Sequence, residues 1–269
     1  MYSRLTIVRK YLQYYIRAAN KNGHGIHSPF LYDFVRNVLN GHQSIPLENR
    51  IEALRIVLLA DHRKIEIEDF GAGGTKGKRI RSISEITRVS SKSRKLGIFL
   101  SRVASHYESG TIIELGTCLG ISTAYLAASN HMTECFTLEG SSTLADLAQS
   151  NFQNLGLTKI KVLKGNFDKT LPLILSDAGG LANKEIDLAF IDGNHRLMPT
   201  LHYFDLIKPR ISMDGLIIFD DIHWSREMEM AWNKIKADPK VTLSIDLFFL
   251  GIVFFREAFK VKQDVEIRF

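Results

Sequence analysis

The sequence contains few of the residues that mark disulfide-rich or zinc-thiolate proteins. Only two of its 269 residues are cysteines, Cys118 and Cys135, and they do not form a Cys-x-x-Cys pair. Neither a disulfide framework nor a cysteine zinc site is therefore indicated, and we expect both thiols to be reduced.

Long apolar runs are also absent. The longest spans residues 247–255 with only Gly251 inside it, which is about half of the roughly 20 residues that a membrane-spanning helix needs. The first 20 residues mix basic and apolar side chains and do not place a charged segment ahead of an apolar block, as a secretory signal would. We therefore expect a cytoplasmic protein without a membrane span.

The overall composition, with 45% hydrophobic and 24% charged residues, is typical of a soluble globular protein. The net charge of +6 is uneven, because residues 1–110 hold 19 Lys and Arg against 9 Asp and Glu. Such asymmetry indicates contact with nucleic acid or anionic lipid, or simply a solvated basic face, which is the commoner cause.

The N-terminal region predicts helices. Residues 3–20 show helical spacing of apolar side chains with basic residues mostly on the other face. Such a helix packs on its own domain, on a second subunit to form a homodimer, or on a membrane. A second helix is expected after Ser28, with Pro29 at its first position, and a third over residues 47–60.

Residues 69–95 are rich in Gly, Ser and cations and have little apolar periodicity, so we expect a mobile loop or lid. Their glycines imitate a nucleotide loop but lack the strand-turn-helix context that would confirm one. We expect residues 1–95 to form a helical extension with this basic lid, and residues 96–269 to form an α/β domain.

From residue 96 onward, strand and helix patterns alternate. Strands are expected at residues 111–115, 135–138, 160–163, 186–191, 216–219, 241–246 and 247–255, and helices at 96–107, 121–130, 143–155, 170–176, 199–207 and 226–237. Short connections between alternating elements predict a mostly parallel sheet of the doubly wound, Rossmann-like type. The last two strands have almost no linker and should form an antiparallel hairpin.

Ligands of such sheets bind beyond the carboxyl ends of the strands. The first strand carries Glu114 just before its last residue and is followed by a turn with Gly116 and Gly120, whose spacing does not match the Gly-x-Gly-x-x-Gly pyrophosphate motif. The second ends at Glu139, where a carboxylate can accept hydrogen bonds from both ribose hydroxyls of an adenosine cofactor, or can be a surface side chain in a turn.

Later strand ends supply further polar groups. The third is followed by Gly165, Asn166 and Phe167, where an adenine ring would lie, although Phe167 could equally belong to the core. The fourth and fifth are followed by acidic side chains, namely Asp192, Asp220 and Asp221. Three converging carboxylates need a cation such as Mg²⁺, Mn²⁺ or Ca²⁺, unless they only cap helices and order turns.

Five motifs in order carry a resemblance to a known family. The run IIELGTCLGISTAYLA, followed by TLEGS, VLKGNFD, FIDGNH and IIFDDIHW, resembles the class I S-adenosylmethionine-dependent methyltransferases. It is closest to the branch with catechol and caffeoyl-CoA O-methyltransferases, over about residues 93–255. The resemblance implies a seven-stranded sheet of order 3-2-1-4-5-7-6 with strand 7 antiparallel.

The resemblance also implies roles for single residues. The methionine end of the cofactor would be held by Glu114, Gly116 and Ser122, the ribose by Glu139, and the adenine by Gly165, Asn166 and Phe167. Gly120, in the same glycine turn, would let the backbone approach the cofactor. Divalent-metal positions fall on Asp192, Asp220 and Asp221, of which Asp192 would also touch the cofactor and the reacting groups. His195 stands where the catechol enzymes have a lysine base, and either serves as the base or is a hydrogen-bonding surface side chain.

These observations favour methylation of a small-molecule hydroxyl, with three rivals. An NAD-dependent oxidoreductase would use the carboxylate after the second strand, but this sequence lacks the Gly-x-Gly-x-x-Gly motif of that class. A nucleic-acid methyltransferase would use the basic N-terminal region, although no Asn-Pro-Pro-Tyr or Asp-Pro-Pro-Tyr sequence occurs. A cofactor-binding scaffold without catalysis is the third.

Overall fold

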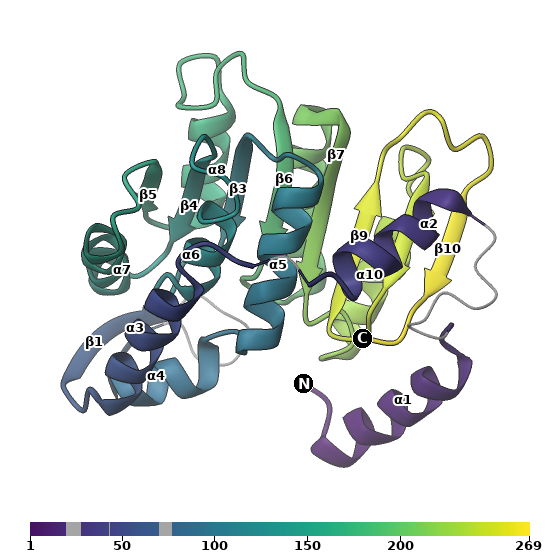
Figure 1. Cartoon of the computed structure of the whole chain (residues 1–269). Helices are drawn as coiled ribbons and strands as arrows, with labels where there is room; N and C mark the ends of the chain where they lie inside the picture. The colour runs from purple at the N-terminus through teal and green to yellow at the C-terminus, as the bar shows by residue number, and fades with distance from the viewer. Residues whose placement is uncertain (20–27, 43, 70–76) are drawn as a thin grey trace. The chain divides into compact units, whose positions relative to one another are not determined.

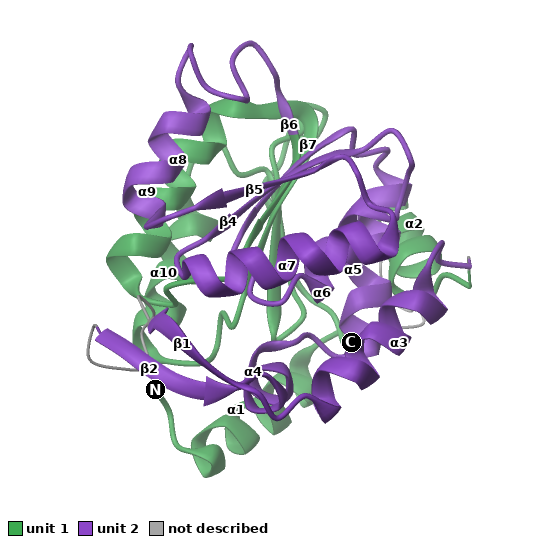
Figure 2. Ribbon diagram, turned by 90° about the vertical axis from the view of Figure 1, so that its left-hand side faces the viewer, with its two compact units in different colours: residues 1–42, 187–269 green, residues 43–186 purple. Residues whose placement is uncertain are grey.

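The structure is a computed structural model that describes residues 1–19, 28–42, 44–69 and 77–269 (Figure 1). The chain divides into two compact units (Figure 2). Unit 1 contains residues 1–42 and 187–269, and unit 2 contains residues 43–186. The division that we expected at residue 95 stays a prediction.

Unit 2 is built on three parallel strands in the order β3-β4-β5. The strands are β3 (Thr111–Leu115), β4 (Glu134–Glu139) and β5 (Ile160–Lys164), and they alternate with helices α5 (Arg94–His106), α6 (Ile121–Ala127), α7 (Ser142–Leu155) and α8 (Phe167–Leu175). Parallel neighbours need a crossover, which here is a helix each time. β3 and β4 are almost wholly buried, as expected for strands covered on both faces.

The segment ahead of α5 contradicts the expected loop over residues 69–95. It contains α3 (Glu48–Ala60), the antiparallel pair β1 (Lys64–Asp69) and β2 (Gly77–Ser82), and α4 (Ile83–Ser90). A capping box between Ser82 and Glu85 starts α4. The sequence shows no apolar pattern for β2 because Ile80 is its only large apolar side chain and the residues beside it are basic. In the structure Ile80 is exposed. The glycine-rich residues 70–76 lie outside the described residues.

Unit 1 contains five strands in the order β10-β8-β9-β7-β6. They are β6 (Ile186–Ile191), β7 (Ile211–Asp220), β8 (Leu243–Asp246), β9 (Leu250–Phe254) and β10 (Gln263–Glu266). β9 runs antiparallel to both β7 and β8, whereas β10 is parallel to β8. A Cβ on Gly251 of β9 would come within 2.7 Å of the Trp232 ring, so glycine is needed for this packing.

The helices of unit 1 match most of the expected ones. They are α1 (Arg4–Arg17), α2 (Pro29–Asp33), the π-helix η1 (Phe34–Leu39), α9 (Leu197–Ile207), the 3₁₀ turn η2 (Lys208–Arg210) and α10 (Arg226–Ala237). Ser28 caps α2 as predicted, and its hydroxyl accepts from the Leu31 amide. Within the described residues, no helix combines the length and apolar character that crossing a bilayer requires.

The predicted fold class is confirmed as α/β with mostly parallel strands. In chain order, unit 2 has the 3-2-1 part of the expected order, and unit 1 has the 4-5-7-6 part with its antiparallel seventh strand, β9. The expected terminal hairpin is β8 and β9. Among the described residues the sheet has one strand more than the seven expected, namely β10, which is short and polar and shows no strand pattern in the sequence.

Candidate functional site

The turn after β3 depends on backbone conformations that favour glycine. Gly116 has a φ of 109° and Gly120 a φ of 84°. The Gly116 amide donates to the Leu138 carbonyl at 3.0 Å, which joins the turn to the end of β4. A Cβ on Gly120 would lie 2.5 Å from the Phe152 ring of α7. The turn therefore needs glycine at residue 116 for its backbone conformation, and at residue 120 also for its close packing against α7.

Glu139 ends β4 and is 9% exposed. Its Oε2 accepts from the Cys118 amide at 2.8 Å, and its Oε1 accepts from the Ser141 amide at 2.9 Å. Burial raises the pKa of Glu139, while these amides act in the opposite direction. An ionised carboxylate has about four acceptor positions. Glu139 is therefore held by backbone on both oxygens and keeps acceptor capacity for a ligand.

Glu114 lies on β3 and is fully buried. Its carboxylate accepts from the hydroxyls of Ser122 at 2.6 Å, Thr123, and Thr137 at 2.6 Å. Burial raises the pKa of Glu114, and the three hydroxyls lower it in part. The structure thus brings Glu114 and Ser122 together. They are buried in unit 2, where Ser122 donates a hydrogen bond to Glu114.

The turn after β5 contains the three residues that we expected near an adenine. The Gly165 amide donates to the Glu139 carbonyl at 2.8 Å, which places this turn beside the end of β4. The side chain of Asn166 caps α8 by accepting from the Asp168 amide at 2.8 Å. Phe167 begins α8 and is half-buried. The expected cofactor residues of unit 2 therefore lie near the carboxyl ends of β3, β4 and β5, in the turns that follow them, or in the first turns of α6 and α8.

In unit 1, Asp192, His195 and Asp220 form one group. Each offers a ligand atom, and these atoms lie within 4.8 Å of one another. His195 Nε2 is 3.6 Å from Asp192 Oδ1. Asp220 ends β7 and is 3% exposed. Two carboxylates and an imidazole are a donor set that suits a divalent cation such as Mg²⁺ or Mn²⁺.

Asp221, the third expected metal residue, is not a member of this group. It adopts a left-handed φ of 57°, and its amide donates to the Phe249 carbonyl at 2.8 Å. Its own carbonyl accepts from the Trp224 amide at 2.9 Å. The backbone of Asp221 thus forms a turn, while Asp220 ends the strand.

Asn194 is a residue of this region that the sequence reasoning missed. Its Nδ2 donates to the Tyr203 hydroxyl at 3.1 Å, while its Oδ1 is buried without a hydrogen-bond partner. A buried amide oxygen without a donor is costly. It therefore fits a site that takes up a donor or a cation. The only signal in the sequence is its place directly before His195, in a turn after a buried strand.

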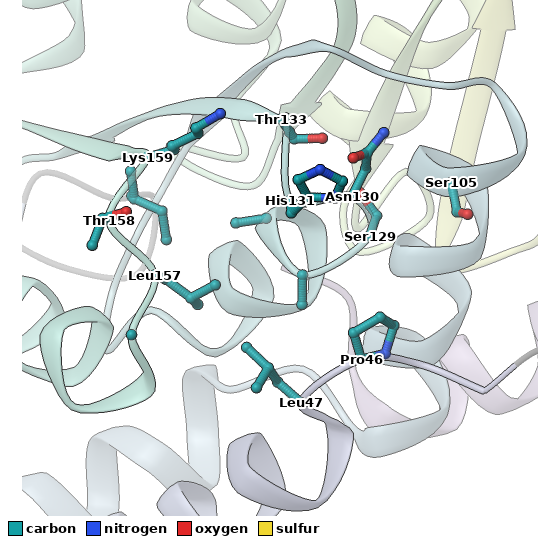
Figure 3. A pocket seen from close by; sticks show the side chains of 14 residues that line it. Pro46, Leu47, Ser105, Ser129, Asn130, His131, Thr133, Leu157, Thr158 and Lys159 are labelled. Atoms are coloured by element: carbon teal, nitrogen blue, oxygen red, sulfur yellow. The ribbon is translucent and has the colours of Figure 1, made fainter.

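Unit 2 also contains a pocket away from these residues. It measures about 650 Å³ and is formed largely by the loops that precede β4 and β5, which include His131 and Lys159, together with Pro46 and Leu47 (Figure 3). These loops are at the amino ends of the strands. None of the expected site residues lines it, so it does not mark the cofactor site.

Comparisons with known proteins support the same assignment. A family of methyltransferase domains matches residues 113–222. The catechol O-methyltransferase of Niastella koreensis is 32% identical over 133 residues, which are 49% of this chain and 57% of that protein. An uncharacterised protein of Acanthamoeba polyphaga mimivirus is 41% identical over 56 residues, 20% of this chain and 25% of that protein. The matches thus span at most little more than half of these relatives.

A solved structure shows the same fold over a longer stretch. The O-methyltransferase of Bacillus cereus, in complex with S-adenosylhomocysteine, superposes with a TM-score of 0.54 and 19% identity, over 84% of this chain and 97% of that one. The resemblance inferred from the five motifs is confirmed. The chain carries a methyltransferase domain over residues 113–222. Together with the similarity to a catechol O-methyltransferase, this domain supports a class I S-adenosylmethionine-dependent methyltransferase of the O-methyltransferase branch.

Proposed function

We propose that the chain transfers the methyl group of S-adenosylmethionine to a hydroxyl of a small molecule, with the help of a divalent cation. The observation that carries this proposal is the buried carboxylate of Glu139, held by backbone amides at the end of β4 and beside the glycine turn. The complex of the Bacillus cereus neighbour with S-adenosylhomocysteine supports the choice of cofactor.

Unit 2 would bind the cofactor. The acceptor capacity that Glu139 retains suits the adjacent hydroxyls of a ribose. The turn from Gly116 to Gly120 would lie at the methionine end, and Asn166 and Phe167 would border the adenine. Glu114 and Ser122 would act indirectly, since their mutual hydrogen bond fixes the start of α6 against β3.

Unit 1 would activate the acceptor. Asp192 and Asp220 would hold the cation, whose charge lowers the pKa of an acceptor hydroxyl. His195 has two candidate roles, since its imidazole would either take the hydroxyl proton or complete the ligand set. Methyl transfer from a sulfonium is an in-line displacement, so the remaining task of the protein is to align the reactants and exclude water.

Methyl transfer from labelled S-adenosylmethionine tests this function, with catechol as the hydroxyl probe and duplex DNA and single-stranded RNA as rival acceptors. We expect a magnesium-dependent, singly methylated catechol in the mass spectrum and unmodified nucleic acid. Methylated nucleic acid with unreacted catechol would instead support the rival suggested by the basic N-terminal region.

A further inference from the structure

Helix α1 is attached to unit 1 by its inner face. Tyr14 and Ala18 are buried against Phe248, with Ile7 and Tyr11 packed beside them. The Tyr14 hydroxyl donates to the Ile267 carbonyl. Through this inner face α1 packs on unit 1, as an amphipathic helix packs on the core of its own domain.

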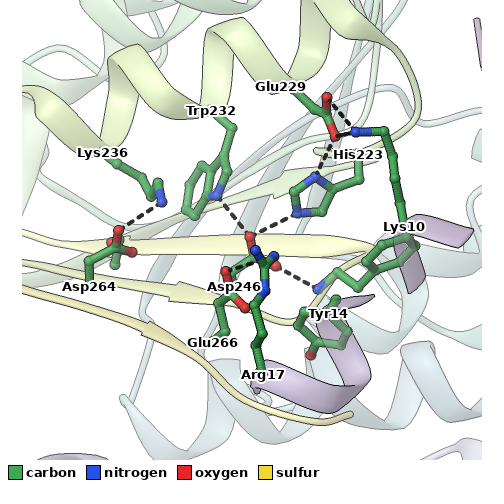
Figure 4. Close-up of polar contacts among 12 residues, drawn as sticks. Lys10, Tyr14, Arg17, His223, Glu229, Trp232, Lys236, Asp246, Asp264 and Glu266 are labelled. Atoms are coloured by element: carbon green, nitrogen blue, oxygen red, sulfur yellow. Dashed lines mark hydrogen bonds and ion pairs between the residues drawn. The ribbon is translucent and has the colours of Figure 1, made fainter. Parts of the chain in front are cut away.

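Polar contacts hold the same face in place (Figure 4). Lys10 Nζ forms an ion pair with Glu229 of α10 at 2.9 Å, and Tyr2 donates to the same carboxylate at 2.7 Å. His223 lies between Glu229 at 3.1 Å and Asp246 at 2.8 Å. The orientation of α1 about its axis is therefore fixed, and so is the face that it turns outward.

The outward face of α1 is apolar. Its large exposed side chains have the spacing of one helical stripe and are Leu5, Val8, Leu12, Tyr15 and Ile16. At roughly 100° per residue they occupy an arc of about 100° opposite Tyr14. Leu5 is 83% and Ile16 77% exposed. Exposed apolar stripes of this kind mark interaction surfaces.

The charge of α1 distinguishes between the surfaces that could cover this stripe. The helix carries four basic residues and no acidic one. Lys10 and Arg17 pair with Glu229 and Glu266 of unit 1, while Arg4 and Arg9 are exposed at the two borders of the stripe. Two copies of α1 facing each other would bring like charges together, which opposes association. An anionic surface would instead be attracted.

We propose that the outer face of α1 docks on an anionic lipid surface. The helix would lie in the plane of the interface, with Leu5, Leu12 and Ile16 in the acyl boundary and Arg4 and Arg9 among the headgroups. This inference is independent of the proposed methyl transfer, because it uses no residue of the candidate site.

Co-sedimentation of the full chain with vesicles tests the proposal. We expect binding to phosphatidylcholine vesicles that contain 30% phosphatidylserine, at least about 10-fold weaker binding to pure phosphatidylcholine, and loss of binding at high salt. The double variant Leu12→Glu/Ile16→Glu should lower partitioning at least about 10-fold. Val89→Glu, at a similarly exposed apolar residue of α4, should leave it unchanged.

Thermal unfolding and a second double variant serve as controls in this test. Thermal unfolding of each variant should match the parent, because the substituted side chains are exposed, and Arg4→Glu/Arg9→Glu should reduce binding while leaving the apolar stripe intact. Failure to bind anionic vesicles, or equal binding by the Leu12→Glu/Ile16→Glu variant, would overturn the proposal. A dimer in analytical ultracentrifugation that this variant dissociates, without vesicle binding, would assign the face to a second copy of the chain.

Discussion

Replacing His195 with alanine should lower methyl transfer to a hydroxyl acceptor by about 100-fold or more, the usual scale of general acid-base catalysis. His195 Nε2 lies 3.6 Å from Asp192, in a group that also contains Asp220. If His195 takes the proton, the variant should also lose the pH dependence of the rate near neutrality. Steady-state kinetics with catechol between pH 6 and 9 measures both effects, and a normal rate would remove His195 from the mechanism.

Binding of Mn²⁺, followed by electron paramagnetic resonance, separates the two roles of His195 without an acceptor. Asp220→Asn should weaken Mn²⁺ binding at least about 10-fold, because it removes a carboxylate ligand from the group. Asp221→Asn is the matched control, because the carboxylate of Asp221 is next to Asp220 in the sequence but lies outside the group. Retained Mn²⁺ binding in His195→Ala would identify a base, and weakened binding would identify a ligand. Full activity in excess chelator would refute the metal.

Glu139→Ala should weaken the binding of S-adenosylhomocysteine by about 1–3 kcal/mol, or roughly 5- to 150-fold, since charge-assisted hydrogen bonds to the ribose are lost. Glu134→Ala is the control, because Glu134 begins the same strand and pairs instead with Lys184. Calorimetry on both variants, with thermal unfolding as a check on the turn, measures the difference. An unchanged affinity would show that Glu139 is not the ribose ligand.

The raised pKa of Glu139 adds a pH dependence to this prediction. Only the ionised carboxylate offers all of its acceptor positions, so protonation weakens binding. Burial raises the pKa of Glu139 above its ordinary value. The loss of affinity should therefore begin at a higher pH than for an ordinary glutamate as the pH falls from 7 to 5. Glu139→Gln, which does not titrate, should show a flat profile over the same range.

The strand ends could be predicted from the sequence because their signals are local. The glycine turn after β3 and the acid at the end of β4 follow short apolar runs, and parallel strands bring such ends to one edge. By contrast, the hydroxyls around Glu114 come from α6 and from β4. No spacing in the sequence indicates that Thr137 points at Glu114, so the hydroxyl shell required the structure.

The acidic residues show a second limit. Asp220 and Asp221 are adjacent, so the pattern could not tell which one joins Asp192 and His195. The left-handed backbone of Asp221 and the hydrogen bond of its amide to the Phe249 carbonyl decide this, and the hydrogen bond depends on contact with the distant turn between β8 and β9. The pairing of β2 with β1 could not be predicted from the sequence either, because most side chains of β2 are basic and only Ile80 is apolar.

Calorimetric titration of the unmodified full chain with S-adenosylhomocysteine, and separately with NAD, tests the central claim most directly. The account predicts micromolar or tighter binding of S-adenosylhomocysteine, with or without Mg²⁺, because a cation at Asp192 and Asp220 would contact the acceptor and not the adenosine. NAD should produce no binding heat, since the turn from Gly116 to Gly120 lacks the pyrophosphate motif. Micromolar binding of NAD, with no response to S-adenosylhomocysteine, would contradict it.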